Sequence, residues 1–324
     1  MIYFFPYIVM LIGGIGLWQG GVAVWSGFLL LFAVIPTIEF FSRNFKFNSA
    51  LFKSNLADVS LFLTPVALSF LLYLALRQAQ ISTHYLELTG IILSTGAMLG
   101  AFGINSAHEL VHRKEKYIRA LGVYNLTLVN FSHWGLEHVF GHHKYVATPL
   151  DSATARQNES VYPFWIRNYF GTLRGAWHIS KTRVSVYGLI SVLVSIVIYI
   201  FFGLKVLLVW WGISVIAILL LQTVDYIEHY ALIRPKNAEG NYMAVKAPHS
   251  WDSSSLLTNI ALFNLGFHSH HHMKAVVHFE DLVEQEAARK MPFGYSVMIL
   301  FALLPWAYIP YMNRRVNLVA NGLS

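Results

Sequence analysis

Long apolar runs constrain this chain more than any other feature of its sequence. Six stretches approach the roughly twenty mostly apolar residues that a helix needs to cross a bilayer. Only 12% of the residues are charged, against about 25% in a typical soluble domain. We therefore expect an all-α integral membrane protein in which residues 1–324 form a single domain. The predicted transmembrane helices lie near 3–19, 21–40, 58–76, 86–107, 184–202 and 205–224.

The positions of the basic residues predict how these helices are oriented. Of the 23 Lys and Arg residues, 21 lie in residues 41–57, in residues 108–183 or after residue 224. Cytoplasmic loops carry such an excess of positive charge, so we expect both termini to be cytoplasmic. We expect the membrane to be a bacterial inner membrane. A nucleic-acid protein would gather its basic residues on a soluble module. No such module is seen, and nucleic acid is not expected as a partner.

A seventh apolar stretch follows the six predicted spans. Residues 294–312 include Pro305 and Pro310, which interrupt a helix by removing a backbone donor. Non-helical backbone is tolerated at membrane depth only where protein or water satisfies it. We therefore expect residues 294–312 to form an interfacial or re-entrant segment rather than a regular span.

Clustered histidines mark the predicted cytoplasmic ends of the spans. His108 and His112 directly follow the fourth span, with the i, i+4 spacing that places two imidazoles on one face of a helix. His138 and His142 repeat that spacing, and His143 lies about 100° further round the helix. We expect each i, i+4 pair to bind one ion and His143 to reach a second one.

Two later clusters complete the set. His229 lies at the inner end of the sixth span, and three histidines between residues 268 and 272 share a face at i, i+3 and i+4. Nine ligands are too many for one ion, so the pattern predicts a binuclear site. Imidazole suits iron, zinc, copper or nickel, which leaves the metal open at this point. The nine candidate ligands are His108, His112, His138, His142, His143, His229, His268, His271 and His272.

Acidic residues flank several of these histidines. Ligating imidazoles commonly donate their second N–H to a carboxylate, and Asp225 lies one turn before His229. His270 points away from the face that its neighbours share, and the isolated His133, His178, His249 and His278 are not expected to bind metal. The candidate carboxylate partners are Glu109, Glu137, Asp225 and Glu228.

Two other functions use the same residues. His108 to His112 match the HExxH signature of membrane metalloproteases, in which Glu109 would be the general base. Such a protease has no use for the remaining seven clustered histidines. A metal transporter would place its ligands within the spans, whereas these histidines lie at the inner ends of the spans. Both functions are therefore remote alternatives to a binuclear enzyme.

Longer motifs around the histidines resemble a known family. From about residue 90 to residue 315 the chain resembles the membrane-bound alkane hydroxylase (alkane 1-monooxygenase) family, within the membrane fatty-acid desaturase and hydroxylase superfamily. The motifs that carry the resemblance are Asn105-Ser106-Ala107-His108-Glu109-Leu110-Val111-His112-Arg113, the run from Glu137 to His143, Val146-Ala147-Thr148-Pro149, Asp151, Ala153-Thr154-Ala155-Arg156, Glu228-His229-Tyr230 with Arg234, Asn264-Leu265, His268-Ser269-His270-His271-His272 and Gly294-Tyr295.

The resemblance implies a specific chemistry. Members of the family hold two non-haem iron ions with nine histidines, which correspond here to the nine candidate ligands. The implied reaction is O2-dependent hydroxylation of a medium- or long-chain alkane or alkyl group, at the terminal carbon. The alternative within the superfamily is a fatty-acyl desaturase or hydroxylase, or an alkyl-aromatic monooxygenase. Electrons would come from a separate rubredoxin or ferredoxin with an NAD(P)H reductase, and the absence of cysteine agrees with a separate donor.

The chain also departs from the family pattern. It has Ala231 where the family commonly has Gly, and Phe267 where Arg usually precedes the last histidine motif. Phe279 stands at the position of an expected Tyr, and the segment before the last histidine motif is short. None of these differences removes a candidate ligand. They concern the substrate and the surface that would meet the electron donor.

Overall fold

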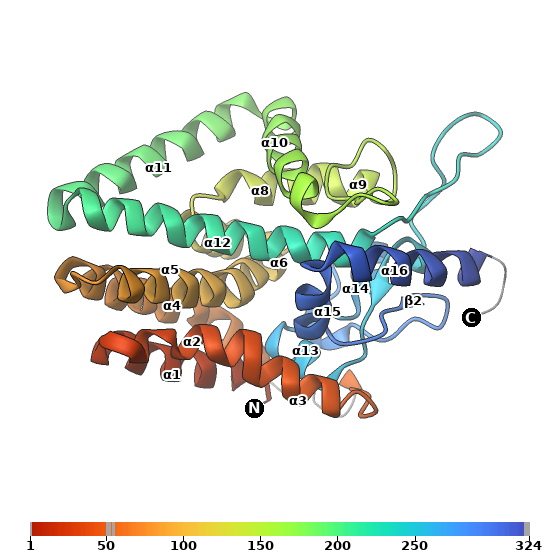
Figure 1. Cartoon of the computed structure of the whole chain (residues 1–324). Helices are drawn as coiled ribbons and strands as arrows, with labels where there is room; N and C mark the ends of the chain where they lie inside the picture. The colour runs from red at the N-terminus through yellow and green to blue at the C-terminus, as the bar shows by residue number, and fades with distance from the viewer. Residues whose placement is uncertain (1, 50–52, 54–55, 321–324) are drawn as a thin grey trace.

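Long helices build most of the chain (Figure 1). The structure is a computed structural model and describes residues 2–49, 53 and 56–320. Within the described residues, six helices are long and apolar enough to cross a membrane, which confirms the predicted all-α membrane fold. The six spans are Ile2–Gln19, Gly21–Phe41, Ala57–Ile81, Tyr85–Val111, Lys181–Phe202 and Leu204–His229.

Several spans are made of more than one helical element. The second span contains a π-helical turn, η3 (Leu30–Val34), and the fourth contains another, η5 (Leu99–Ile104). Wider π turns of this kind often occur at functional sites. The elements of the spans are η1 (Ile2–Phe4), α1 (Phe5–Gln19), η2 (Gly21–Trp25), α2 (Ser26–Leu29), α3 (Ile35–Phe41), α4 (Ala57–Ile81), α5 (Tyr85–Met98), α6 (Asn105–Val111), α11 (Lys181–Phe202) and α12 (Leu204–His229).

Glycines produce the tight turns between paired spans. Gly20 separates α1 from η2 with φ 73°, and Gly203 separates α11 from α12 with φ 84°. A residue with a Cβ rarely adopts this left-handed backbone. Each pair of spans can therefore reverse direction within one residue.

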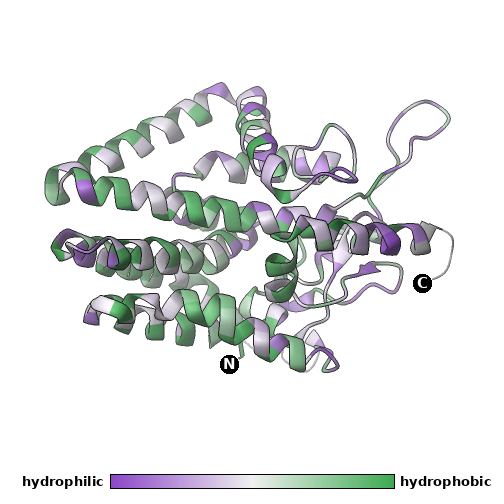
Figure 2. Ribbon diagram, viewed as in Figure 1, coloured by the Kyte–Doolittle hydropathy of each residue, from purple (hydrophilic) through white to green (hydrophobic). Residues whose placement is uncertain are grey.

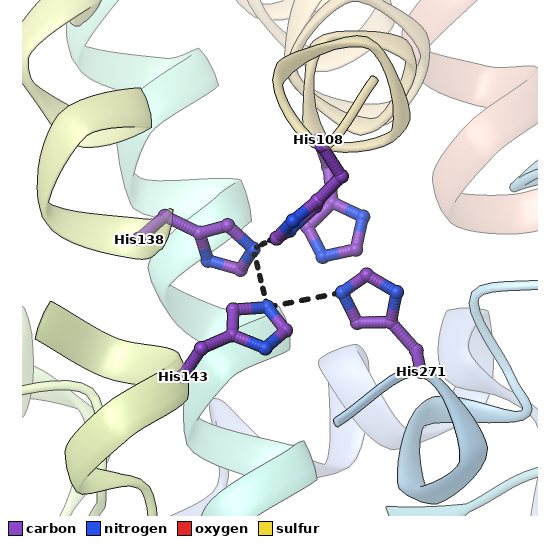
Figure 3. A group of neighbouring side chains, drawn as sticks. His108, His138, His143 and His271 are labelled. Carbon is purple, nitrogen blue, oxygen red and sulfur yellow. Dashed lines mark hydrogen bonds between the residues drawn. The ribbon is translucent and has the colours of Figure 1, made fainter. Parts of the chain in front are cut away.

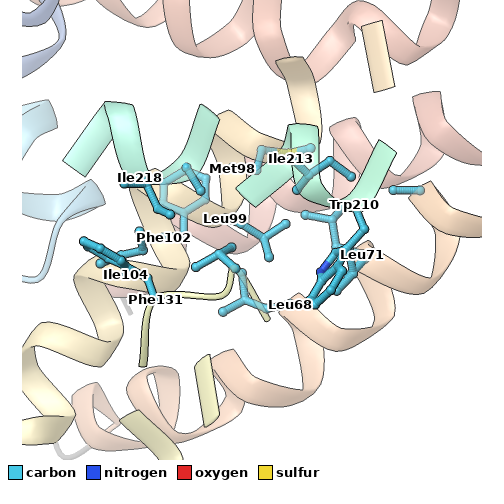
Figure 4. Packing of buried hydrophobic residues seen from close by; sticks show 14 of the residues in the cluster. Leu68, Leu71, Met98, Leu99, Phe102, Ile104, Phe131, Trp210, Ile213 and Ile218 are labelled. Atoms are coloured by element: carbon cyan, nitrogen blue, oxygen red, sulfur yellow. The ribbon is translucent and has the colours of Figure 1, made fainter. Parts of the chain in front are cut away.

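Close helix packing forms the centre of the membrane bundle. A Cβ on Gly96 of α5 would lie 2.6 Å from the Cβ of Ile216 on α12, so only glycine allows the two helices to approach this closely. Leu68, Phe102 and Trp210 are buried in the apolar cluster between α4, η5 and α12 (Figure 4). Small residues at a helix interface let backbones approach closely in membranes.

The outer surface of the bundle suits a lipid environment. The long helices are largely hydrophobic, whereas hydrophilic residues gather at the end near α9 and β2 (Figure 2). On α11 the large apolar side chains of Leu189, Ile200 and Phe201 are exposed. Exposed apolar side chains over a whole helix would be unfavourable in water, so this helix is placed to contact lipid.

The remaining elements gather at one end of the bundle. α15 (Tyr295–Ala302) and α16 (Pro305–Ala320) meet at an angle of 120°, so residues 294–312 do not form a straight span. β1 (Trp251–Asp252) pairs in parallel with β2 (Arg289–Lys290). The other elements are α7 (Lys116–Thr127), α8 (Ser132–Glu137), η6 (His138–His142), α9 (His143–Tyr145), α10 (Val161–Ile179), η7 (Ala247–His249), α13 (Leu256–Ala261), α14 (His268–Met273) and η8 (Phe279–Asp281).

Candidate metal centre

The structure brings the nine candidate ligands together in two groups at one end of the spans. In each group the nearest ring nitrogens lie within 4.8 Å of one another. We call them the five-histidine group and the four-histidine group. Figure 3 shows four members of the five-histidine group with their rings facing one another. The five-histidine group contains His108, His112, His138, His143 and His271, and the four-histidine group contains His142, His229, His268 and His272.

A π-helical turn divides the central cluster between the two groups. His138 and His143 belong to the same group, with 3.1 Å between their Nε2 atoms, although they are five residues apart. His142 faces the other group, and its Nε2 lies 3.2 Å from Nε2 of His272. The expected i, i+4 pairing of His138 with His142 is therefore wrong. η6 has i to i+5 geometry, and a turn of that width aligns residues five apart.

The last cluster is divided as well. His268 and His272, at i, i+4 on α14, contact each other at 3.0 Å between Nε2 atoms in the four-histidine group. His271 instead contacts His143 at 3.1 Å in the five-histidine group. The three histidines that were expected to share one helix face therefore divide between the two groups. Adjacent residues on a helix point about 100° apart, and α14 lies between the two groups so that it supplies both.

The donor set fits a cation. Ring nitrogens face one another at 3.0 Å between His112 and His138 and at 3.1 Å between His229 and His268. The Nε2 atom of His108 is buried and has no hydrogen-bond partner among the described residues. A buried polar atom without a partner is costly. Binding of a metal ion by converging imidazole lone pairs would satisfy these atoms.

The electrostatics differ between the groups. Burial lowers the pKa of His112 to about 3 and holds the pKa of His143 and His271 well below the usual range. These imidazoles are therefore neutral at neutral pH, as metal ligands must be. For His142 burial also opposes the charged form, but the buried carboxylate of Asp151 outweighs it and raises the pKa to about 9.

Asp151 is the carboxylate that orients His142. Its Oδ2 atom accepts from Nδ1 of His142 at 3.0 Å and from the Thr154 hydroxyl at 2.6 Å. Burial favours the neutral acid, but His142 and Thr154 hold the pKa of Asp151 below its usual value. Sequence analysis did not select Asp151 for this role. It lies in a loop nine residues after its partner, where helical spacing gives no signal.

Glu228 is a predicted carboxylate partner that does contact the four-histidine group. One oxygen lies 3.2 Å from Nε2 of His268, and the other accepts from the Tyr295 hydroxyl at 2.7 Å. The sequence indicates no role for Tyr295 beyond its place in the Gly294-Tyr295 motif. Its buried hydroxyl fixes the carboxylate that reaches the ligand.

Other predicted carboxylate partners point elsewhere. Asp225 accepts from Asn168 at 3.2 Å, while Nδ1 of His229 has no partner among the described residues. Glu109 forms an ion pair with Arg113 at 3.1 Å. The structure thus does not show the expected contact between Asp225 and His229.

Glu137 is buried against two glycines. A Cβ on Gly141 would lie 2.3 Å from its carboxylate oxygen, and a Cβ on Gly175 would lie 2.8 Å from its Cγ. Burial, with a contribution from the nearby Asp151, raises the pKa of Glu137 to about 8. Glu137 is thus packed behind η6, where it separates that turn from α10.

The histidines that were not selected lie outside both groups. Nδ1 of His270 accepts from the backbone of Val283 at 3.1 Å, and Nδ1 of His249 accepts from the backbone of Lys246 at 3.0 Å. His133 packs against Phe131. These contacts give each imidazole a structural partner away from the groups.

Two adjoining cavities lead to the histidines from inside the bundle. The inner cavity is lined by His108, His138 and His268, together with Trp134 and Glu228. The outer cavity is mainly apolar and includes Leu31, Phe32 and Phe102. The residues that line both cavities are Ala101, Leu220, Leu262 and Ile299.

Six apolar helices and two histidine groups define a multi-pass membrane protein with a histidine-rich metal-binding site. The fatty acid desaturase family model matches residues 82–302. Because the match covers more than half of the chain, the protein belongs to the fatty acid desaturase family.

Curated relatives narrow the comparison. The chain is 34% identical over 263 residues to alkane 1-monooxygenase of Pseudomonas putida, covering 74% of this chain and 63% of the relative. It is 34% identical over 247 residues to alkane 1-monooxygenase 2 of Alcanivorax borkumensis, covering 72% and 65%. It is 25% identical over 235 residues to the xylene/toluene monooxygenase hydroxylase component of Pseudomonas putida, covering 68% and 62%. The chain thus spans a little less than two thirds of the length of these relatives.

Proposed function

We propose that the protein is an O2-dependent, non-haem di-iron monooxygenase that hydroxylates a medium- or long-chain alkane or alkyl group at its terminal carbon. The observation that carries this proposal is the pair of all-histidine groups, of which His108, His138 and His268 line a cavity that adjoins a mainly apolar one. The similarity to alkane 1-monooxygenases of two organisms supports it.

The proposed cofactor is two iron ions, one in each histidine group. Bound there, the ions would supply the oxidising power that insertion of oxygen into an unactivated C–H bond requires. The chain holds the imidazoles in place for them, and Asp151 fixes the ring of His142 by accepting from Nδ1. Such supporting contacts orient a ligand and set its tautomer. Glu228, held by Tyr295, lies instead against Nε2 of His268, the nitrogen that faces the other ligands, so its carboxylate would stand beside the proposed ion.

The cavity walls account for the proposed substrate. An alkyl chain has no polar group for recognition, so shape and apolar contact must position it. Leu31, Phe32 and Phe102 would surround the chain in the outer cavity, and Trp134 lines the inner cavity beside His108 and His138. Exclusion of water by these walls would protect reactive species from side reactions.

The electron donor is proposed to be a separate rubredoxin or ferredoxin, reduced by an NAD(P)H reductase. His112 and His143 are only partly buried, so the five-histidine group approaches the protein surface. Exposed lysines follow three of its ligands in the chain: Lys114, Lys144 and Lys274. A positive rim would attract an acidic carrier and speed its association. We infer that the donor docks over His112 and His143.

Charge reversal tests this docking site. Lys144→Glu should raise the donor concentration needed for half-maximal turnover several-fold, with a weaker dependence on salt. Lys236→Glu, on the hairpin formed with Tyr242, is the control and should change neither. Equal effects of the two variants would contradict the proposed position.

The proposed location is a bacterial inner membrane with both termini in the cytoplasm, as the distribution of Lys and Arg favours. The alternative activity is fatty-acyl desaturation or hydroxylation, or alkyl-aromatic monooxygenation. The family match and the 25% identity to the xylene/toluene monooxygenase component favour keeping it.

Product analysis tests the proposed activity. Membranes that contain the protein, supplied with a donor, a reductase, NAD(P)H and O2, should convert an unfunctionalised alkane to the terminal alcohol. A membrane with His271→Ala provides the matched control. An alkene product, or activity confined to acyl thioesters, lipids or methylated aromatic rings, would reject alkane hydroxylation in favour of the alternative.

A further inference from the structure

Glu39 is a buried carboxylate in the second span, away from both histidine groups. It lies on α3 and is 1% exposed. An acidic side chain within a membrane span is costly, so its partners must compensate for the lost hydration. Neither the metal ligands nor their carboxylate partners include Glu39, and the sequence analysis did not single it out.

Donors from two separate helices surround the Glu39 carboxylate. Oε1 accepts from the backbone N–H of Thr258 at 3.1 Å and from its hydroxyl at 2.6 Å, and also from the Ser255 hydroxyl. Oε2 accepts from the backbone N–H of Ser296 at 3.0 Å and from its hydroxyl at 2.5 Å. Thr258 and Ser296 lie in the first turns of α13 and α15, so one carboxylate joins the starts of both helices to α3.

Gly294 shows how closely the carboxylate is enclosed. A Cβ on this residue would lie 1.9 Å from Cδ of Glu39, so the carboxyl group packs directly on the glycine backbone. The Tyr295 N–H donates to the Thr258 hydroxyl at 2.8 Å, which links α15 to α13 beside Glu39. These contacts leave the carboxylate little room to move.

The two helices joined by Glu39 lead to the four-histidine group. α13 precedes α14, which carries His268 and His272. α15 begins with Tyr295, whose hydroxyl donates to Glu228 at 2.7 Å, and Glu228 lies 3.2 Å from Nε2 of His268. A chain of contacts therefore runs from Glu39 through Tyr295 to a candidate metal ligand.

The same contacts define part of the outer cavity. Glu39, Thr258, Tyr295 and Ser296 line it together with the apolar side chain of Ile299. One side of its wall comes from α3, α13 and α15, the three helices that Glu39 joins. A shift of α15 relative to α3 would therefore move the cavity wall and Tyr295 at the same time.

We propose that Glu39 is a positioning residue that fixes the substrate cavity relative to the four-histidine group. This inference rests on the proposed function, because it assigns the cavity to substrate and the histidines to metal. Glu39 acts through Thr258 and Ser296 and belongs to neither histidine group. It determines which carbon of the bound chain lies nearest the histidines.

The test compares Glu39→Gln with Glu87→Gln. Glutamine keeps the size of the side chain but presents an NH2 group to donors, so contact with one helix is lost. Glu87 is the control because it accepts from Gly21, Gln78 and Ser82, each at 2.7 Å. It joins the spans at their other ends, away from the histidine groups. Ser296→Ala removes one of the two contacts from Ser296 and serves as a milder variant if Glu39→Gln does not fold.

Two measurements report on the inference. Metal-free protein loaded with cobalt(II) alone should show a changed absorption spectrum for one of its two ions in Glu39→Gln and, less strongly, in Ser296→Ala. In the iron-loaded protein, hydroxylation should shift from the terminal carbon toward inner carbons, with roughly tenfold slower terminal hydroxylation, the lower end of the loss that follows removal of a supporting contact. Glu87→Gln should match the wild type in both measurements.

The outcomes separate the inference from the proposed function. A wild-type protein that binds no cobalt and forms no alcohol would overturn the proposed function and this inference with it. A wild type that does both, with an unchanged spectrum and product distribution in Glu39→Gln, overturns the positioning role alone. Equal changes in Glu39→Gln and Glu87→Gln would also overturn it, since they would indicate a general loss of structure.

Discussion

The two histidine groups differ in exposure and in support. Two members of the five-histidine group, His112 and His143, are partly exposed, whereas all four members of the other group are buried. The four-histidine group contacts the carboxylates of Asp151 and Glu228. The comparison indicates that two chemically similar sites are built for different tasks. One group reaches the surface, where electrons would enter in the proposed function, and the other is enclosed and held by two carboxylates. Both groups border the inner cavity, the first through His108 and His138 and the second through His268.

Removing ligands should have the largest effect on this comparison. His271→Ala should remove the ion of the five-histidine group, and His272→Ala that of the four-histidine group, because these adjacent residues face different groups. Each variant should retain about one ion and lose measurable turnover, since metal affinity depends on a complete ligand set. Metal analysis of the purified proteins and product assays provide the measurement.

His270→Ala is the matched control for those variants. His270 accepts from the Val283 backbone and belongs to neither group. The His270→Ala variant should therefore keep two ions and most of the activity. The division into two groups would be contradicted if the single substitution His271→Ala removed both ions. It would also be contradicted if His271→Ala and His272→Ala both kept their full metal content.

Asp151 should matter for one group only. Asp151→Asn weakens the acceptor for Nδ1 of His142, and loss of such a partner typically lowers metal affinity about 10- to 100-fold. Competition with a chelator should show weaker binding of one ion and unchanged binding of the other. Asp281→Asn, which affects an exposed ion pair with Lys53, should change neither. Weakening of both sites by Asp151→Asn would argue against its specific role.

The pKa values predict that pH separates the groups. The pKa of His142, raised to about 9, means that its imidazole carries a proton at neutral pH, and that proton must leave before metal binds. Affinity of the four-histidine group should therefore rise with pH up to about 9, by at most about tenfold per unit for one proton. The pKa of His112, lowered to about 3, predicts no such dependence for the five-histidine group between pH 6 and 9.

Metal titrations of metal-free protein at several pH values provide the measurement. The sign is fixed by the direction of the His142 shift: binding to the four-histidine group weakens as pH falls. Parallel pH profiles for both ions would contradict the electrostatic difference between the groups.

The smallest expected effect concerns the backbone after His229. Ala231 has φ 57°, in the left-handed region, which favours Gly. A residue with a Cβ loses about 1 kcal/mol there, part of which the greater freedom of unfolded glycine cancels. Ala231→Gly should raise the thermal unfolding midpoint slightly and leave metal content unchanged. The control is Ala176→Gly, inside α10, which should lower the unfolding midpoint. If Ala231→Gly lowered the midpoint too, the proposal that the backbone at Ala231 is strained would be contradicted.

The apolar runs predicted the membrane spans, and the helical spacing of the histidines predicted the set of candidate ligands. The six spans were confirmed because a run of apolar residues long enough to cross a membrane has few other stable states. The predicted ligand set is brought together in space: His108, His112 and His229 lie at the ends of two packed spans, and η6, α9 and α14 bring the other six histidines to them. Their binding of metal remains a proposal.

The arrangement within the site could not be predicted. The assignment of His138 and His142 to one ion assumed a regular α-helix, and the π turn of η6 changes which side chains align. Asp151 reaches His142 from a loop nine residues further along the chain, and Glu39 meets the start of a helix 219 residues away. Periodicity carries no information on such contacts, because they depend on how the helices pack.

The metal content of the purified protein tests the central claim most directly. Elemental analysis with Mössbauer spectroscopy of protein produced with iron-57 should give two iron ions per chain in two distinct nitrogen-rich environments. One environment should be lost in His271→Ala and the other in His272→Ala. A single ion per chain, two equivalent irons, or zinc in place of iron in active protein would contradict the account.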